Sequence, residues 1–485
     1  MKTPAPKILL PEKLGFGLGE FGNNLFWQFF MYFQFYFYTD IFKIAPGADA
    51  AKTAGIMFMI VRSVDSFIDM LIGIIADRTE TRWGKYRPWL LFGAVPFGLI
   101  GVAAFTTPDF SQATKVIYAY LTYSLLMVIY STVSIPQNSL LGVMTDDPAE
   151  RTILSKYKFL FAFAAGFTVK FCTPWLVGRL GAGNDALGYQ RTVWIFAAIA
   201  IIGLSTTFLT IRERVFPPKE QKPNLGLDLR QLLSNGPWIA VVFIGLFTIL
   251  SIAIRSGTLM HYFKYYVGNQ TVAVPLFGMI SLTYGELFSG FMFIGSITAI
   301  LGTFTVPWMD KTLGRRGSYA FYVGSSAALI AAVYMVKPGQ ITALFLLEAG
   351  INMLQAPTCA VLWTMFADCA DFGEWKHGRR ATALIFSAGI MSNKWGWALG
   401  ALIPGYLLTS FGYIADAVQS ERTLSGMVLI VSLIPAGFAA LAAILTLTYP
   451  LTTAKLKTIH EELKQRRGED DRVGDDLSEI GRAAV

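Results

Sequence analysis

Charged residues are scarce in this sequence. They account for 15% of its 485 residues, whereas a soluble domain carries about 25%. Hydrophobic residue types reach 54%, and the mean hydropathy is +0.50. This shortage of charge argues against a soluble protein and predicts an all-α polytopic membrane protein.

Cysteine and histidine are also rare, with three of each. Cys172, Cys359 and Cys369 lie in apolar stretches without CxxC spacing, which predicts neither a disulfide framework nor a zinc site. The histidines are far apart in the sequence, and we place none of them in the middle of a membrane span. A membrane-embedded enzyme or sensor is therefore disfavoured, and we expect no enzymatic activity.

The N-terminal stretch lacks a long apolar core with a small-residue cleavage site, so we expect no signal peptide. The net charge of +8 comes from Lys and Arg in short connections between apolar runs, which indicates membrane topology and not nucleic-acid binding. These cations concentrate in alternate connections. We therefore expect a multi-pass protein of a bacterial inner (plasma) membrane with both termini in the cytoplasm.

Apolar runs separated by charged or Gly/Pro-rich breaks predict about twelve membrane-spanning helices. We place them roughly at residues 15–41, 53–77, 88–107, 115–145, 153–178, 191–212, 237–266, 283–309, 318–336, 341–368, 381–411 and 424–449. The predicted domains are an N-terminal six-helix bundle, a cytoplasmic linker, a C-terminal six-helix bundle and a cytoplasmic tail, at residues 1–212, 213–236, 237–449 and 450–485. The start of the tail, 452–467, is amphipathic, and we expect it to lie on the membrane surface.

The two halves resemble each other at the ends of corresponding spans. Asp77-Arg78 and a basic loop close the second span, and Asp310-Lys311 and a basic loop close the eighth. Two repeats with equivalent helix ends are typical of transporters that work by alternating access.

Asp65, Asp69 and Arg62 lie within one apolar segment. Each such group costs about 2.5–3.5 kcal/mol at the centre of a bilayer on insertion scales. One explanation is a buried Arg62–Asp65 ion pair that only holds helices together, and the other is that the carboxylates bind a cation. Lys394 lies deep in another span, and we expect the two aspartates to be its partners.

Other polar groups lie in the predicted spans. Lys170 and Arg255 either face a cavity or extend toward the outer surface. Amides and hydroxyls beside aromatic rings suit a polyhydroxylated solute. The polar residues at mid-span positions include Asn24, Gln28, Ser134, Gln137, Asn138, Gln355 and Asn393.

Four stretches resemble one known family. The run from Asp65 to Trp89 reads D-x-x-x-D-x-x-x-G-x-x-x-D-R-T-x-x-R-W-G-K-x-R-P-W, and it is joined by Lys13–Asp40, Ile135–Leu154 and Asp371–Gly396. Together they resemble the glycoside–pentoside–hexuronide:cation symporters, the melibiose permease-like branch of the major facilitator superfamily. The resemblance implies a major facilitator fold with twelve helices in two pseudo-symmetric halves. It also implies symport of a sugar or glycoside with H⁺ or Na⁺ and no cofactor besides that ion.

The resemblance assigns roles to Asp65, Asp69, Lys394, Arg151, Lys158 and the Asp371–Arg380 loop. The other residues in the following sets are our expectation from the polar and charged side chains in and beside the predicted spans. The coupling residues are Asp65, Asp69, Lys394 and Ser134, and Asp65 and Asp69 are metal ligands if the ion is Na⁺. The cargo-binding residues are Asn24, Gln28, Arg62, Gln137, Asn138, Lys170, Arg255, Gln355, Trp363, Asn393 and Lys394. The cytoplasmic gate consists of Asp77, Arg78, Arg82, Arg151, Lys158, Asp371 and Arg379.

Three positions depart from the family's best-known pattern. Asn24 and Ser134 stand where the melibiose permease has aspartates, and Asn138 stands where it has a tryptophan. With two acids lost and four intramembrane cations present, the site is more positive, which favours an anionic cargo such as a hexuronide or a sulfonated sugar. A neutral sugar, and a lipid, peptide or drug on the same fold, remain alternatives. The expected partners are the small-molecule cargo, the cation and the lipid bilayer, and we expect a monomer.

Overall fold

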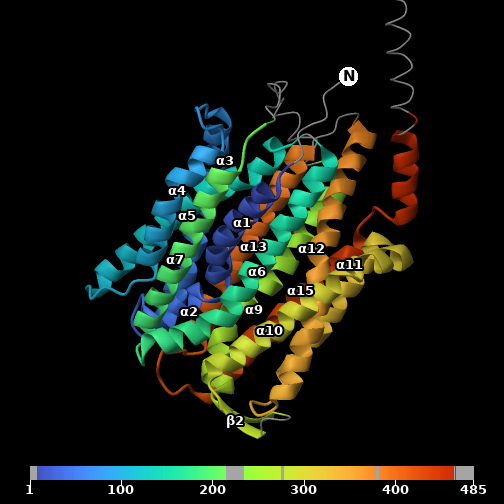
Figure 1. Cartoon of the computed structure of the whole chain (residues 1–485). Coiled ribbons are helices and arrows are strands. Elements are labelled where there is room, and N and C mark those ends of the chain that lie inside the picture. The colour runs from blue at the N-terminus through green and yellow to red at the C-terminus, as the bar shows by residue number, and fades with distance from the viewer. Residues whose placement is uncertain are drawn as a thin grey trace, which may run out of the picture.

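Long helices lying side by side make up this computed structural model (Figure 1). The structure describes residues 8–145, 147–214, 234–274, 278–377, 382–463 and 465. The first half contains α1 (Leu10–Tyr32), α2 (Gln34–Tyr36), the π-helix η1 (Phe37–Ile41), α3 (Asp49–Arg78), α4 (Arg87–Ala104), α5 (Gln112–Val143), α6 (Pro148–Gly181) and α7 (Asp185–Thr210).

The second half begins with α9 (Gly236–His261) and the π-helix η2 (Tyr262–Val267). It continues with the strands β1 (Gln270–Val274) and β2 (Gly278–Leu282), and with α10 (Tyr284–Thr303), α11 (Val306–Ala332), the 3₁₀ turn η3 (Val333–Met335), α12 (Ile341–His377), α13 (Thr382–Ser410), α14 (Glu421–Val431) and α15 (Leu433–Thr448).

Local chemistry explains where several helices begin. Ser111 and Asn235 cap α5 and α9 by accepting hydrogen bonds from the backbone N–H groups of Thr114 and Trp238. Glu213 accepts hydrogen bonds from three successive backbone N–H groups at the start of α4, those of residues 85–87. A carboxylate at this position compensates the positive end of the helix dipole. The first residues of the predicted linker are thus bound to the first half, while residues 215–233 lie outside the described part of the chain.

Each predicted span coincides with a helix of the structure. In the described ranges, nine helices are long and apolar enough to cross a membrane. The helices α1, α3 and α13 are not among them, and α3 carries Arg62, Asp65 and Asp69 along its length. The helical fold is confirmed, and the count of twelve spans stays a prediction. Two boundaries were wrong. The helix α12 continues to His377 and makes the start of the expected Asp371–Arg380 loop helical, and α11 begins at Val306, so the basic loop expected between residues 309 and 318 is helical apart from a kink at Gly314.

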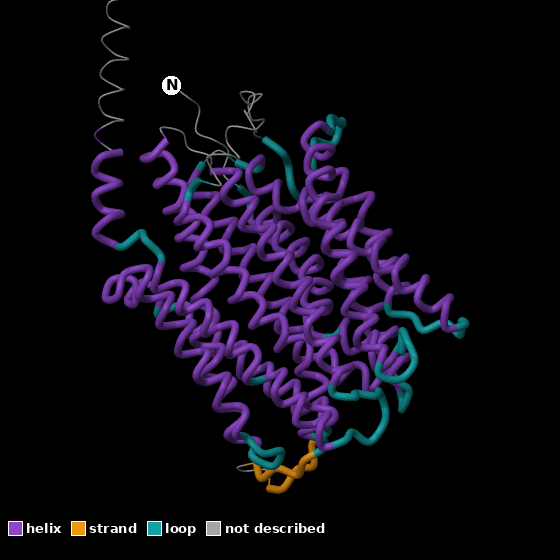
Figure 2. The backbone as a smooth tube through the Cα atoms, turned by 180° about the vertical axis from the view of Figure 1, so that it is seen from behind, coloured by secondary structure: helices purple, strands orange, loops and turns teal. Residues whose placement is uncertain are grey.

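A short hairpin marks one end of the bundle, which we call the hairpin end (Figure 2). Strands β1 and β2 pair antiparallel with Gln270 opposite Leu282, a feature that the sequence did not lead us to expect. The described beginning and end of the chain both lie at the opposite end, which we call the terminal end (Figure 1).

The two halves contact each other mainly through α3 with α13 and α6 with α10. Near the hairpin end, Thr409 donates a hydrogen bond of 2.8 Å to the carbonyl oxygen of Ala48. A Cβ at Gly405 would lie 2.5 Å from the carbonyl oxygen of Ala51, so the close approach of α3 and α13 there requires glycine. Phe171 of α6 packs on Phe293 of α10, with ring centroids 5.7 Å apart.

The helix at residues 453–463 packs against the second half of the chain. Its apolar residues Leu456, Ile459 and Leu463 are buried in the same cluster as residues of α11 and α12. Trp375 of α12 also donates a hydrogen bond of 2.6 Å to Glu462. The apolar face that we expected on the membrane surface therefore contacts protein instead.

Candidate functional site

Two carboxylates of α3 and one ammonium of α13 meet midway along these helices. Asp65 and Asp69 are about one turn apart, so they share a face of α3. Lys394 Nζ lies 3.1 Å from Asp65 Oδ2 and also forms an ion pair with Asp69. The predicted contact between Lys394 and both aspartates is confirmed, and it joins the two halves of the chain.

A hydroxyl group completes the surroundings of Asp65. Ser131 of α5 donates a hydrogen bond of 3.1 Å to Asp65 Oδ1. We expected Ser134 to have this place, but Ser134 accepts a hydrogen bond from Asn138 through its backbone carbonyl instead. Ser131 lies nearly one turn earlier in the same apolar segment, and a search for every hydroxyl on that face of α5 would have included it.

The two aspartates retain capacity to bind a cation. Asp69 Oδ1 is buried without a hydrogen-bond partner among the described residues. A proton or a small cation that entered would compete with Lys394 for the carboxylate oxygens. In the described ranges, no group of three or more His, Cys, Asp or Glu side chains is placed to hold a metal ion.

Arg62 does not form the ion pair with Asp65 that we considered. It is buried, and its guanidinium lies over the ring of Trp27, 5.4 Å from the ring centroid. No ion pair within 4 Å joins it to a carboxylate in the part of the chain that the structure describes. Arg62 lines a pocket of about 400 Å³, including its open mouth, beside Gln34 and Trp397.

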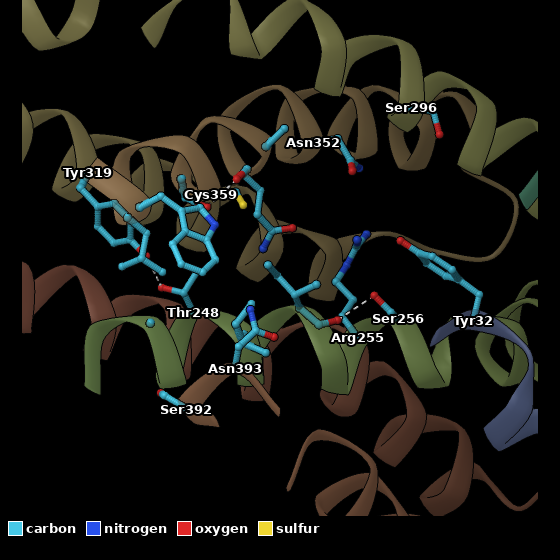
Figure 3. Close-up of a pocket in the computed structure, with 18 of the residues that line it drawn as sticks. Tyr32, Thr248, Arg255, Ser256, Ser296, Tyr319, Asn352, Cys359, Ser392 and Asn393 are labelled. Carbon is cyan, nitrogen blue, oxygen red and sulfur yellow. Dashed lines mark hydrogen bonds between the residues drawn. The ribbon is translucent and has the colours of Figure 1, made fainter. Parts of the chain in front are cut away.

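A larger cavity, of about 1160 Å³ including its open mouth, lies next to these groups. Figure 3 shows its polar side chains converging from several helices. Its polar and aromatic lining comprises Tyr32, Lys170, Thr248, Arg255, Ser256, Ser296, Tyr319, Glu348, Asn352, Gln355, Thr358, Trp363, Phe366, Ser392 and Asn393. Most of these residues belong to the second half of the chain.

Five of the predicted cargo-binding residues line this cavity, namely Lys170, Arg255, Gln355, Trp363 and Asn393. Sequence reasoning left out Tyr32, Thr248 and Ser256. Glu348 and Asn352 also lie in an apolar run of the sequence, but we did not predict them as cargo-binding residues.

The other predicted cargo-binding residues are engaged elsewhere. Asn24 donates hydrogen bonds to Glu20 on the same helix. Gln137 is fully buried and donates to the carbonyl oxygen of Phe16. Asn138 is exposed and accepts a hydrogen bond from Lys158.

Gln28 also lies apart from the cavity lining. It lies against Gly166 of α6, where an added Cβ would come within 3.2 Å of its amide. Together with Asn24 and Gln137 it therefore belongs to the packing of the first half, whereas Asn138 is exposed.

Arg255 and Lys170 differ in how their charges are balanced. Arg255 is buried, and its Nη2 lies 2.5 Å from Glu348 Oε2. Lys170 is half-buried, and its Nζ lies over the ring of Tyr32, 4.9 Å from the centroid. No carboxylate in the described residues pairs with Lys170. Both side chains face the cavity, so they do not extend toward the outer surface as the alternative required.

A second buried group of polar residues joins the halves near the hairpin end. Asp40 of η1 is fully buried and accepts hydrogen bonds of 2.5 Å from the hydroxyls of both Tyr265 and Tyr413. His261 Nε2 and Lys264 Nζ each lie 3.1 Å from its carboxylate oxygens. We call this set, with Thr39, the Asp40 network. Our sequence reasoning missed it, although Asp40 ends one of the family-like stretches.

Asp416 extends this network toward the surface. Its carboxylate lies 2.7 Å from Lys264 Nζ and 2.8 Å from Lys43 Nζ. Partial burial raises the pKa of Asp416, but the hydrogen bonds from Lys264 and Lys43 outweigh it and hold the pKa below its ordinary value.

The predicted gate residues that the structure describes lie at the terminal end, and the contacts described for them stay within one half. Arg151 donates to the carbonyl oxygens of residues 145 and 142. Asp77 accepts a hydrogen bond of 2.6 Å from Tyr86. Asp371 lies 3.1 Å from His460 Nε2.

The remaining gate residues are basic. Arg78 is exposed, and the guanidinium of Arg82 lies over the ring of Trp83. Arg379 lies outside the described residues. Because the Asp40 network and the α3–α13 contact join the halves at the other end, this conformation is closed at the hairpin end.

Comparisons with known proteins agree over nearly the whole chain. Residues 15–453 match the family model described as MFS/sugar transport protein. The inner membrane symporter YicJ of Escherichia coli is 33% identical over 94% of this chain and 95% of its own length. The glucuronide carrier protein homolog of Escherichia coli is 32% identical over 94% of this chain and 95% of its own length.

A solved structure supports the fold. The nucleoside transporter NupG superposes with a TM-score of 0.62 at 17% identity, and the match covers 90% of this chain and 99% of that protein. At this identity the likeness concerns the fold alone.

Proposed function

This chain belongs to the family of MFS/sugar transport proteins, which are membrane transporters and not enzymes, and on that premise we propose that it carries an acidic sugar together with a cation. Symport of a sugar with a cation is the activity that the family implies. The acidic group of the cargo, the location of the ion at Asp65 and Asp69, and the identity of the gate are our proposals.

The observation that carries the proposal is the free charge of Lys170 on the cavity wall. Arg255 is neutralised by Glu348, and Lys394 by Asp65 and Asp69. Lys170 has an aromatic neighbour but no ion pair in the described residues. An unpaired ammonium at membrane depth is costly, and an anionic cargo would supply the missing partner.

The rest of the cavity suits the body of a sugar. Amides of Asn352, Gln355 and Asn393 both donate and accept hydrogen bonds, as sugar hydroxyls do. Tyr32 and Trp363 offer rings on which the apolar face of a sugar can stack. One relative is named as a glucuronide carrier protein homolog, and a glucuronide is a sugar of this class.

We propose that the cation acts through Lys394. A proton or Na⁺ on Asp65 and Asp69 would weaken their hold on Lys394 and loosen the contact between α3 and α13. Since coupling is a free energy shared by two sites, cation and cargo should each tighten binding of the other. Closure at the terminal end would then bring together the gate residues Asp77, Arg78, Arg82, Arg151, Lys158, Asp371 and Arg379.

The test is binding of p-nitrophenyl β-D-glucuronide and p-nitrophenyl β-D-glucoside to the purified full-length protein. We expect the glucuronide to bind at least about tenfold more tightly, since one charge-assisted hydrogen bond is worth about 1.5–3 kcal/mol. Lys170→Gln should remove most of this preference without weakening the glucoside. Lys337→Gln, in an exposed loop at the hairpin end, is the matched control.

Equal or better binding of the glucoside to the wild-type protein would exclude an acidic cargo. Uptake measured with and without Na⁺ at fixed pH, and across pH without Na⁺, identifies the ion. Reporter fusions at the C-terminus of the chain test the proposed inner-membrane location and cytoplasmic termini.

A further inference from the structure

Arg255 and Glu348 form a buried ion pair on the cavity wall. Arg255 belongs to α9 and Glu348 to α12, and their relative exposures are 6% and 2%. The Nη2–Oε2 distance is 2.5 Å, and Asn352 donates a hydrogen bond of 2.7 Å to the other carboxylate oxygen. In the described lining of the cavity Glu348 is the one carboxylate.

The Arg255 guanidinium keeps unused hydrogen-bonding capacity. Its Nε is buried without a partner among the described residues. Figure 3 shows the side chain extending from its helix into the cavity, beside Tyr32 and toward Asn352 on the facing helix. A guanidinium is the side chain best suited to hold a carboxylate or sulfonate through two parallel hydrogen bonds. Glu348 therefore occupies a position that the acidic group of a cargo could take.

We propose that Arg255 exchanges Glu348 for the acidic group of the cargo, and that Glu348 takes up a proton in the exchange. The carboxylate of the cargo, which pairs with Lys170, also forms a new ion pair with Arg255 on the same cavity wall. The Arg255–Glu348 ion pair breaks, and a proton from water binds Glu348 Oε2. The cargo brings one negative charge and the proton one positive charge, so the net charge of the cavity wall is unchanged. The neutral Glu348 no longer competes for Arg255.

This proposal rests on the proposed acidic cargo and adds a second proton-binding carboxylate. Glu348 is separate from Asp65 and Asp69, because it lies in the second half and is paired with a different cation. The exchange avoids leaving a buried charge without a partner, which is strongly unfavourable in a membrane. The other titratable or charged side chains on the described wall are Tyr32, Lys170, Arg255, Tyr319 and Cys359.

The alternative is that the ion pair only holds α9 to α12. Proton uptake on cargo binding distinguishes the exchange from a purely structural ion pair, because a structural ion pair neither binds nor releases a proton when cargo binds. Isothermal titration calorimetry in two buffers of different ionisation enthalpy measures that uptake directly. The probes are the same glucuronide and glucoside, bound to the full-length protein.

For the wild-type protein with the Arg255–Glu348 ion pair intact, we expect about one proton to be taken up per glucuronide bound. The Kd should then weaken by up to about tenfold for each unit by which the pH is raised. Binding of the neutral glucoside should cause no proton uptake by Glu348, because the glucoside has no acidic group to replace Glu348 at Arg255. Glu348→Gln should bind the glucuronide without this proton, at every pH as tightly as the wild-type protein does at low pH. Asp65→Asn should still take up one proton at Glu348 when the glucuronide binds, because Asp65 is not part of the Arg255–Glu348 ion pair.

A wild-type preference for the glucuronide without proton uptake overturns the exchange and leaves the acidic cargo standing. Uptake of one proton per glucuronide by the Glu348→Gln variant also overturns the exchange. No preference at any pH overturns both proposals together.

Because Glu348→Gln leaves Arg255 without its partner, the double variant Arg255→Gln/Glu348→Gln provides a second measurement. It buries no unpaired charge, keeps the size of the side chain at residue 348 and shortens the side chain at residue 255. We expect it to fold, to take up no proton and to lose most of the glucuronide preference. Wild-type preference and proton uptake in this variant would refute the proposal.

Discussion

Replacing Asp40 by Asn should open the hairpin end of the protein. Asn keeps the size of the side chain but has one acceptor oxygen and no charge. Asp40 accepts from Tyr265 and Tyr413 and lies within 3.1 Å of His261 and Lys264. Every one of these partners belongs to the second half of the chain, so the contacts exist only while the two halves touch.

The size of the effect follows from the contacts that Asn cannot keep. Hydrogen bonds to a charged group contribute about 1.5–3 kcal/mol each. The substitution Asp40→Asn removes the ionic contact with Lys264 and one acceptor oxygen. The loss of about two such interactions weakens the closed state by about 3 kcal/mol, or about 150-fold in the ratio of closed to open molecules.

The assay is the distance between spin labels on the two halves at the hairpin end. Cysteines at Asp109 and Gly339, in a background without the three native cysteines, carry the labels. In Asp40→Asn a population with longer distances should appear or grow. Asp49→Asn is the matched control, because Asp49 is exposed near the same end. Identical distance distributions for Asp40→Asn and the unsubstituted protein would refute the role of the network in closure.

Two further predictions concern charged groups. Asp65→Asn and Asp69→Asn should abolish ion-driven accumulation of cargo while leaving cargo exchange largely intact, because each removes a carboxylate that pairs with Lys394. The measurement is uptake of cargo into vesicles under an ion gradient. Full accumulation by both variants would contradict the assignment of Asp65 and Asp69 to cation coupling. The depressed pKa of Asp416 means that its ion pairs are fully present above the ordinary aspartate pKa of about 3.9 and are lost as pH falls through the lower folded value. Protonation of Asp416 should therefore weaken the contact between the halves at the hairpin end only below about pH 4. Asp416→Asn should show the same weakened contact at neutral pH in the spin-label measurement.

The sequence alone determined the helical spans and the pairing of Lys394 with Asp65 and Asp69. Both follow from the membrane, in which the backbone must satisfy its own hydrogen bonds and a buried charge must find an opposite charge. Two aspartates in one span and a lysine deep in another made this pairing the expected one, although the sequence also left an Arg62–Asp65 ion pair open. The family-like stretches identified the same residues independently.

Only the tertiary structure decided which polar side chains are available to a cargo. Asn24 and Gln137 looked as suitable as Gln355, but the first binds its own helix and the second binds α1, whereas Gln355 faces the cavity. The Asp40 network likewise brings Asp40 and Tyr413 together across 373 positions of sequence. Such choices depend on which helix faces meet and on how deep each residue lies, and a pattern within one helix carries no information about its neighbours.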